Sequence, residues 1–179
     1  MNALADVEVG KYLNTYFVSS FQKIGTFRVS GTRKQGGNVA SYFCTPDGQV
    51  LHVVAGPVNA AVLLREARWV VETYKLAQLE GQDDPMRFQT FIRKAHADRL
   101  RQEYRLDVRD LPAPNYAATA QPSLPDTARG KKRGQIGQQG QAHLLLATYP
   151  MPRIGQIYVL VFERILNQRL STGPVVVKN

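Results

Sequence analysis

The sequence predicts an α/β fold, because two short strands joined by a tight turn are followed directly by a long helix. Residues 39–44 and 49–55 are rich in β-branched and aromatic side chains, a composition typical of strands. Residues 45–48 read Thr-Pro-Asp-Gly, which favours a turn with proline at its first central position and glycine at its exit. Asn59 then caps a helix whose apolar residues recur at helical spacing, with charged residues such as Glu66 off that stripe. One face of this helix should cover the hairpin.

Upstream of the hairpin, the sequence predicts a short helix and a strand. Residues 4–16 carry apolar side chains in loose helical register, and residues 17–24 are predicted to form a strand that continues into residues 26–29. The glycine-rich, basic segment 30–37 is interpreted as a surface loop, because it lacks the glycine spacing of known phosphate-binding loops.

Downstream of the hairpin, a second long helix is predicted to begin after Asp84, which supplies an N-cap in front of a proline. Residues 111–141 are rich in proline, glycine and glutamine and have few apolar anchors, so they are interpreted as a mobile linker. Order should return with an apolar strand at 144–149 and a helix at 154–170 that has one broad apolar face. Residues 175–177 could pair at a sheet edge.

The predicted organisation therefore has three parts. Residues 1–110 form a core with an additional basic helix, and residues 111–141 form the flexible basic linker. Residues 142–179 form a strand and helix that pack on the core or on a partner chain.

The composition excludes several classes of protein. The chain of 179 residues has one cysteine and three histidines, so it is not a disulfide scaffold and lacks the four close ligands of a structural zinc site within one chain. No cofactor is predicted. The first residues lack the basic region and the apolar core of a signal peptide, and no run of about 18 apolar residues occurs. We expect a soluble, cytoplasmic protein that does not bind membranes, and a longer precursor with other signals stays open.

The net charge of +9 favours an anionic partner such as a nucleic acid. Residues 87–109 hold seven basic residues against three acidic ones, and residues 129–133 add a second basic cluster. A solvated helix face with a basic linker explains the same pattern. The candidate nucleic-acid-binding residues are Arg93, Lys94, Arg101, Lys131, Lys132 and Arg133.

The hairpin and the helix after it resemble the C-terminal half of thioredoxin-like domains. The resemblance covers roughly residues 6–75. Residues 36–39, Gly-Gly-Asn-Val, stand where that family has glycines followed by a cis-proline, and residues 44–48 stand where it often turns its hairpin. The resemblance implies an α/β fold with a thioredoxin-like sheet whose N-terminal half is incomplete, plus additional C-terminal helices and a strand.

The redox chemistry of the family does not carry over to this chain. Its Cys-x-x-Cys motif needs two cysteines, whereas this chain has only Cys44, and Val39 occupies the position of the cis-proline. The resemblance also implies a gap in the sheet, because a central parallel strand of the family would precede residue 17. We predict that the apolar strand at 144–149 fills this gap, from the same chain or from a second chain in an exchanged dimer.

Three functions stay open from the sequence. The first is a non-catalytic thioredoxin-like protein that binds a protein partner, or a second copy of itself, through the 154–170 helix. The second is a nucleic-acid-binding protein, and the third is a thiol enzyme that uses Cys44. No catalytic or metal-binding residue is predicted: His96 is interpreted as structural or solvent-facing, and spacing assembles no catalytic set from Cys44, His52 and His143.

Overall fold

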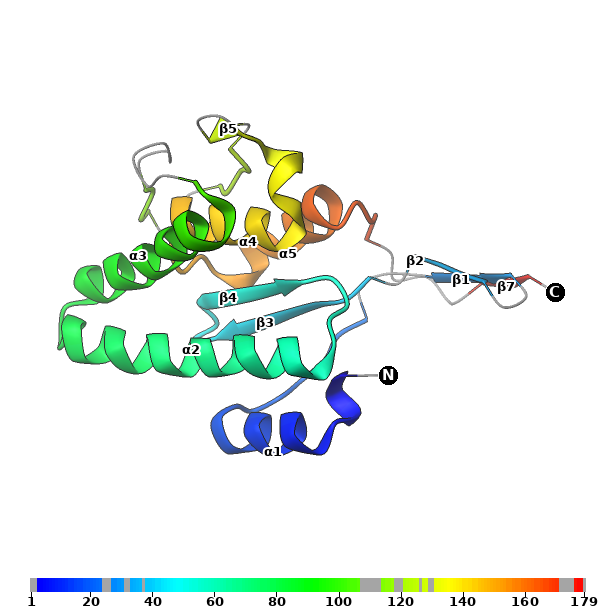
Figure 1. The fold of residues 1–179 in the computed structure, drawn as a ribbon, viewed down its shortest axis with the longest axis horizontal. Coiled ribbons are helices and arrows are strands. Elements are labelled where there is room, and N and C mark those ends of the chain that lie inside the picture. Colours follow the sequence, from blue (N-terminus) through cyan, green and yellow to red (C-terminus); the bar gives the residue numbers. More distant parts are fainter. Residues whose placement is uncertain are drawn as a thin grey trace.

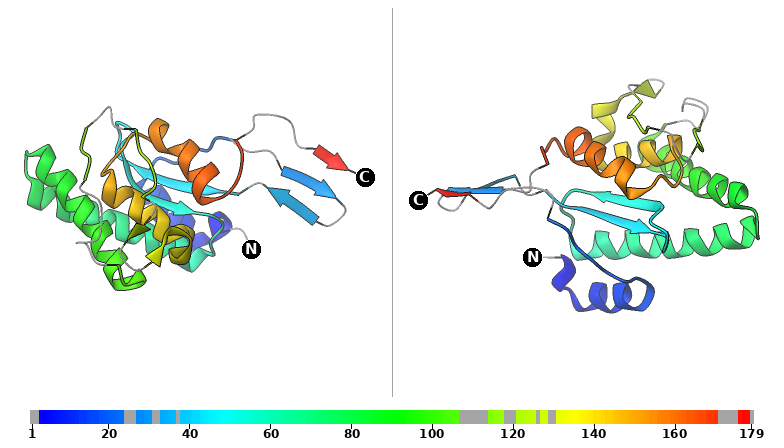
Figure 2. Two further views of the ribbon diagram at one scale, coloured as in Figure 1. Left: turned by 90° about the horizontal axis from the view of Figure 1, so that it is seen from above. Right: turned by 180° about the vertical axis from the view of Figure 1, so that it is seen from behind.

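The computed structural model shows a mixed helix and strand fold centred on the predicted β-hairpin (Figure 1). Helices cover both faces of the hairpin, and a small separate sheet extends away from this body (Figure 2). The structure describes residues 3–23, 27–30, 33–36, 38–106, 114–117, 121–125, 127–128, 131–170 and 176–178.

The central hairpin joins strand β3, Ala40–Cys44, to strand β4, Val50–Ala55, in antiparallel register. The Gly48 N–H donates to the Thr45 carbonyl oxygen at 2.9 Å, which confirms the predicted turn. Gly48 has a φ of 82°, a conformation that glycine adopts without the steric penalty of other residues. All residues of β4 are buried, so this strand is the centre of the fold.

Two long helices follow the hairpin, and both begin at their predicted caps. Helix α2, Ala60–Gly81, starts after Asn59, whose side chain accepts a hydrogen bond from a backbone N–H of the first turn at 2.9 Å. Helix α3, Pro85–Tyr104, starts after Asp84, whose carboxylate accepts from two such N–H groups. Each cap stabilises its helix by about 1 kcal/mol. In the described part of the chain, no helix has the length and apolarity that a membrane span requires.

The N-terminal segment confirms the predicted helix and corrects the predicted strand. A 3-10 turn, Ala3–Ala5, leads into helix α1, Val7–Tyr16, which packs on α2. Residues 17–23 form no strand, and Phe21 among them is 97 % exposed. Their apolar side chains alternate poorly, so neither face of a strand at this place would be apolar enough to be buried.

The predicted strand at 144–149 is wrong, because residues 144–148 belong to helix α4, Gly137–Thr148. A short apolar run cannot be assigned to a strand or to a buried helix from periodicity alone. Every residue from Gln141 to Thr148 is buried, which explains why the run shows no polar face. The hypothesis that these residues complete a sheet, within the chain or by exchange, is therefore contradicted.

Part of the segment interpreted as a linker has regular structure. Strands β5, Thr127–Ala128, and β6, Lys131–Lys132, pair antiparallel, and a 3-10 turn, Arg133–Ile136, leads into α4. Ile136 is buried in a cluster with residues of α3 and α4. The ordered C-terminal part of the chain thus begins before residue 142, because apolar contacts to α3 hold this turn in place.

The predicted C-terminal helix is formed by helix α5, Ile154–Leu160, and a π-helical segment, Val161–Ile165. It ends before residue 170. Its apolar face is buried in a cluster with residues of β4 and α4. The face expected to receive a partner or a second copy is therefore covered by the chain's own core.

Two clusters of buried apolar side chains occupy the two faces of the hairpin. The first lies between the hairpin, α1 and α2, and it includes Phe43 and Leu51. The second lies between the hairpin, α4 and α5, and it includes Val50 and Val53. Each fully buried side chain of this size contributes about 1.5–3 kcal/mol. Helix α3 contacts both α2 and α4, so it connects the two layers (Figure 1).

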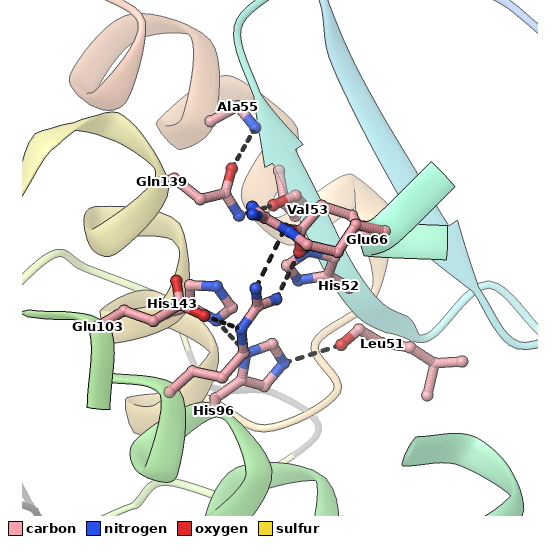
Figure 3. Close-up of polar contacts among 11 residues, drawn as sticks. Leu51, His52, Val53, Ala55, Glu66, His96, Glu103, Gln139 and His143 are labelled. Atoms are coloured by element: carbon pink, nitrogen blue, oxygen red, sulfur yellow. Dashed lines mark hydrogen bonds and ion pairs between the residues drawn. The ribbon is translucent and has the colours of Figure 1, made fainter. Parts of the chain in front are cut away.

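The outer edge of β4 is closed at one end by a side chain of α4. Gln139 accepts a hydrogen bond from the Ala55 N–H at 3.1 Å and donates to the Val53 carbonyl oxygen at 2.8 Å (Figure 3). Its amide thus takes the place of a neighbouring strand, since a strand would offer the same donor and acceptor.

The other end of the same edge is closed by a loop and by a side chain of α3. The Val50 N–H donates to the Pro152 carbonyl oxygen at 2.8 Å. The His96 ring meets the Leu51 carbonyl oxygen at 2.9 Å. The outer edge of β4 is therefore closed by helical side chains and a loop, and this brings α3 and α4 against β4. The gap predicted from the sequence lay at the other edge of the hairpin, between residues 17–24 and 39–44, and the structure does not fill it with residues 144–148, which are helical.

The separate sheet joins distant parts of the chain. Strand β1, Phe27–Ser30, pairs antiparallel with β2, Arg33–Gly36, and parallel with β7, Val176–Lys178. The predicted edge strand at 175–177 is confirmed for its described residues. The segment 30–37, predicted to be a loop, contains β2. The sheet projects from the body in Figures 1 and 2.

Candidate metal centre

Three elements that meet at the outer edge of β4 each contribute one histidine to a common point. His52 lies on β4, His96 on α3 and His143 on α4, and all three are fully buried. One potential ligand atom from each ring lies within 4.8 Å of the other two, and Figure 3 shows the rings side by side. Metal-bound imidazole nitrogens lie about 2.0–2.1 Å from Zn²⁺, so a cluster of this size needs only small side-chain shifts to hold an ion.

Hydrogen bonds define the tautomer of two of the rings. His96 Nε2 lies 2.9 Å from the Leu51 carbonyl oxygen, which can only accept, so Nε2 carries the proton. His52 Nε2 lies 3.1 Å from a carboxylate oxygen of Glu66 and carries its proton for the same reason. Both rings therefore have their lone pair on Nδ1, the atom that a metal ion would bind.

His143 completes the cluster with a lone pair of its own. Its Nδ1 lies 2.8 Å from Nδ1 of His96 and donates to it, because the His96 atom carries no proton. Its Nε2 is then an acceptor. In the described structure neither this atom nor His52 Nδ1 has a hydrogen-bond partner. An unpaired buried polar group costs about 1–3 kcal/mol. A cation held by all three rings would take the lone pair of His52 Nδ1, and it would replace the proton between His96 Nδ1 and His143 Nδ1, which would then move to His143 Nε2.

Burial keeps the three imidazoles neutral. It lowers the pKa of His96 to about 3, and it lowers the pKa values of His52 and His143 below their ordinary value. Metal ions bind the neutral form of imidazole. At neutral pH, therefore, no positive charge on the rings opposes metal binding.

Glu66 of α2 orients the His52 ring. Its carboxylate accepts hydrogen bonds from Arg99 on both oxygens and from Arg65 at 2.9 and 3.1 Å. Burial alone would raise the pKa of Glu66, but hydrogen bonds from His52 and Arg99 outweigh it and hold the pKa far below its ordinary value. The ionised carboxylate behind His52 resembles the outer-shell groups that orient metal-binding histidines.

Arg99 and Trp69 lie close to the cluster on the side of α2 and α3. Arg99 also donates to Glu103 at 2.8 Å, and its guanidinium carbon lies 4.8 Å from the centroid of the Trp69 ring. The Trp69 ring meets the rings of His52 and His96 edge-on, with centroids 4.9 and 5.1 Å apart. With these side chains in place the histidines have no exposure to solvent, which strengthens every electrostatic interaction among them.

Cys44, the redox candidate from the sequence, lies outside this cluster. It is half-buried at the end of β3 and packs beside the apolar cluster of α4 and α5. Burial raises the pKa of its thiol to about 11. A thiol in this environment is almost entirely protonated at neutral pH and is a poor nucleophile.

The basic candidates from the sequence are spread over two places. On α3, Lys94 and Arg101 are exposed, Arg93 is half-buried, and Arg101 pairs with Asp98 at 3.1 Å. Arg99, counted among the same basic residues, is buried in the ion pair with Glu66. Lys131 and Lys132 form β6 and Arg133 begins the 3-10 turn; their side chains lie outside the described part of the structure. Nucleic-acid binding by these residues stays a prediction.

The sequence did not predict the histidine cluster because its members lie on three elements and share no local spacing. The usual signal of a helical site, two histidines separated by one turn, is absent. One signal was present in Glu66, which falls between the buried Leu63 and Val70 on the apolar stripe of α2. We expected Glu66 off that stripe, and the structure corrects this, because its partner Arg99 makes a buried position acceptable for a carboxylate.

We compared the chain with known protein families, proteins and structures. No family model, curated protein or solved structure matches the chain significantly. The functional argument therefore depends on the geometry of the three histidines and of the groups around them.

Proposed function

We propose that this protein binds a divalent transition-metal ion with His52, His96 and His143 as its three protein ligands. The observation that carries the proposal is the convergence of three ring nitrogens in a fully buried cluster, in which His52 Nδ1 has a lone pair and no hydrogen-bond partner among the described residues. Buried polar atoms in native proteins nearly always have a partner. A purely structural histidine cluster would be expected to use this atom in a hydrogen bond.

The hydrogen-bond partners of the His52 and His96 rings support the same function. The Nε2–H of His52 donates to Glu66, and the Nε2–H of His96 donates to the Leu51 carbonyl oxygen. Metal-binding histidines almost always donate their second ring N–H to a carboxylate or a backbone carbonyl. Both arrangements are formed here, and both direct Nδ1 inward as the ligand.

The donor set favours zinc among the abundant metals. Neutral imidazoles suit Zn²⁺ and the neighbouring Co²⁺, Ni²⁺ and Cu²⁺, whereas Mg²⁺ and Ca²⁺ prefer oxygen. Within the described residues, no cysteine or carboxylate belongs to the convergent group. Three protein ligands leave one position of a tetrahedral Zn²⁺ open, as in zinc sites that hold water or an added ligand.

Zinc titration tests the proposal. After treatment with EDTA and removal of the chelator, calorimetric titration with zinc chloride should show about one ion per chain. His143→Phe keeps an aromatic ring in the core but removes a ligand, so we expect zinc affinity to fall at least about 100-fold. Far-UV circular dichroism would establish that the variant is folded.

Trp69→Phe provides the matched control. This change alters an aromatic ring that touches the histidines but offers no ligand, so zinc affinity should stay within about threefold of the unchanged protein. Failure of the unchanged protein to bind zinc would overturn the proposal. So would unchanged affinity in a folded His143→Phe variant.

The thioredoxin-like resemblance stays a proposal that is restricted to the hairpin and α2. It is supported by the order β3, β4, α2 and by the turn at residues 45–48. A thioredoxin-like binding module is compatible with a metal centre. Two of the three ligands of the centre come from α3 and α4, which lie outside the unit formed by the hairpin and α2.

A further inference from the structure

We propose, on the basis of the metal site above, that the bound ion takes a small monoanion as its fourth ligand, and that this anion enters from the groove between α2 and α3. The argument begins with charge. The three imidazoles are neutral ligands, so they leave both positive charges of a divalent ion uncompensated. In the described structure, Glu66 and Arg99 are the buried charged side chains, and they already neutralise each other.

A loaded site would therefore hold a net charge of about +2 in the protein interior. Uncompensated charge in a low-dielectric interior is strongly unfavourable, and it is relieved by an ion of opposite sign. A neutral water molecule as fourth ligand would leave the charge unchanged. A monoanion would halve it, and the open tetrahedral position is the place where an anion can approach the ion directly.

The groove between α2 and α3 lies next to the cluster: none of the three histidines lines it, and an anion would pass Trp69 and Arg99 to reach the ion. Its volume is about 550 Å³, and Trp69 and Arg99 form part of its lining. These are the same side chains that contact the histidine cluster and the carboxylate behind it. The exposed Arg65 and Arg68 line the same groove and present positive charge to an incoming anion, and the acidic Glu72 and Glu103 in the same lining offset part of it.

The size of the ligand is limited by the packing around the rings. The centroids of the three histidine rings lie 5.0 to 5.6 Å apart, and the Trp69 centroid lies 4.9 to 5.9 Å from each of them. Rings at these distances are in contact. An anion of a few atoms, such as azide or a small carboxylate, fits this description better than a larger substrate does.

Cobalt provides the direct test, because Co²⁺ occupies zinc sites and its visible spectrum reports the fourth ligand. The protein loaded with Co²⁺ would be titrated with sodium azide in chloride-free buffer, and with acetonitrile as a neutral ligand of similar size. We expect azide to change the visible bands saturably and acetonitrile to leave them unchanged. A Co²⁺ spectrum that is indifferent to azide would overturn this inference and leave metal binding intact. Absence of any protein-bound Co²⁺ spectrum would instead overturn the proposed function.

Variants that change the charge near the histidines test whether uncompensated positive charge drives anion binding. Arg99→Met leaves the Glu66 carboxylate to compensate the ion, so azide affinity should fall at least about tenfold. Glu66→Gln leaves the guanidinium with only the partly exposed Glu103 as an acidic partner and should raise azide affinity. The double variant with both changes restores the original net charge, and its azide affinity should return to within about threefold of the unchanged protein.

The two single variants are expected to act in opposite directions, so one of them suffices if the other does not fold. Equal azide affinity in a folded, metal-loaded single variant and in the unchanged protein would overturn the charge argument. Lys94→Gln removes one positive charge from an exposed position of α3 outside the groove lining, and it should leave azide affinity unchanged.

Discussion

Nδ1 of His96 and Nδ1 of His143 lie 2.8 Å apart across the contact between α3 and α4, and a single proton joins them. A metal ion would replace this proton and add His52 of β4, so three elements would be tied through one centre. A ligand that binds only the folded state stabilises it, by about 2.7 kcal/mol at 100 times its Kd.

Zinc should therefore raise the melting temperature, by about 5–10 °C at 100 times Kd for a chain of this size. Circular dichroism melting curves with zinc chloride and with EDTA would measure the shift. Magnesium chloride at the same concentration should have little effect, because the three ligands of the site are imidazole nitrogens and Mg²⁺ prefers oxygen. A melting temperature that is equal in zinc and EDTA would contradict a native metal centre.

The metal-free protein should lose stability in mild acid. The unfolded chain titrates its histidines near pH 6.5, whereas burial lowers the pKa of His96 to about 3 and lowers those of His52 and His143. Below about pH 6.5 the unfolded state binds more protons than the folded state does. The free energy of unfolding therefore has its full value above that pH, and it falls as the pH decreases toward the pKa values of the folded state. The charged groups around the rings, Glu66 and Arg99, stay ionised throughout this window.

His96 and His143 would together lower the free energy of unfolding by about 2.5 kcal/mol between about pH 7 and about pH 5.5, and His52 would add to this decrease. Urea denaturation in the presence of EDTA at constant ionic strength would measure this change. His143→Phe should reduce the decrease by about 1.3 kcal/mol. A flat profile between these pH values would show that the rings are not held neutral in the folded state.

The ion pair between Glu66 and Arg99 should behave as a unit in stability measurements. Glu66→Gln leaves the buried Arg99 guanidinium with only Glu103, which is partly exposed, so the change should cost about 3 kcal/mol, the low end for breaking a buried pair. Adding Arg99→Met should recover most of this loss, because replacing both partners of a buried pair is often nearly neutral. Urea denaturation of the single and double variants gives the coupling free energy. Additive effects of the two changes would contradict the pairing.

Local signals predicted the parts of the fold that are local in origin. Asn59 and Asp84 cap their helices because a short polar side chain reaches the first-turn N–H groups, whatever surrounds it. The turn at Gly48 likewise depends on only four residues. Such features need no knowledge of distant contacts, so they can be read from a single sequence.

The closure of β4 and the histidine cluster depend on contacts between distant residues. Gln139 pairs with the backbone 84 residues away at Ala55, and His96 pairs with His143 across 47 residues. Neither contact leaves a spacing pattern in the sequence. The run at 144–149 was assigned to a strand because it is short and apolar throughout, whereas it belongs to a buried helix whose Gln139 pairs with the outer edge of β4.

The thiol of Cys44 should be unreactive in the folded protein. Burial raises its pKa to about 11, so only about 0.1 % is thiolate at pH 8, against about a quarter in an unfolded chain. Alkylation by iodoacetamide at pH 8, followed by mass spectrometry, should be at least about 100-fold slower in the native protein than in urea. Comparable rates in both states would restore Cys44 as a candidate nucleophile.

Gln139 should stabilise the fold more than its exposed neighbour Gln138 does. Gln139→Ala leaves the Ala55 N–H and the Val53 carbonyl oxygen without partners, and the lost pair of hydrogen bonds should cost about 2–3 kcal/mol. Gln138→Ala, a change to an exposed side chain on the same helix, should alter the free energy of unfolding by no more than about 0.5 kcal/mol. Urea denaturation measures both.

Amide hydrogen exchange locates the effect of the Gln139→Ala change. The Ala55 N–H should exchange faster in this variant, because its acceptor is the Gln139 side chain. Gln139 and His143 are one helical turn apart on α4, so the same change should loosen the position of His143 and weaken zinc binding. If Gln139→Ala and Gln138→Ala had equal stability and equal Ala55 exchange, the outer edge of β4 would not be held by this side chain. The placement of α4, and of His143 with it, would then need another cause.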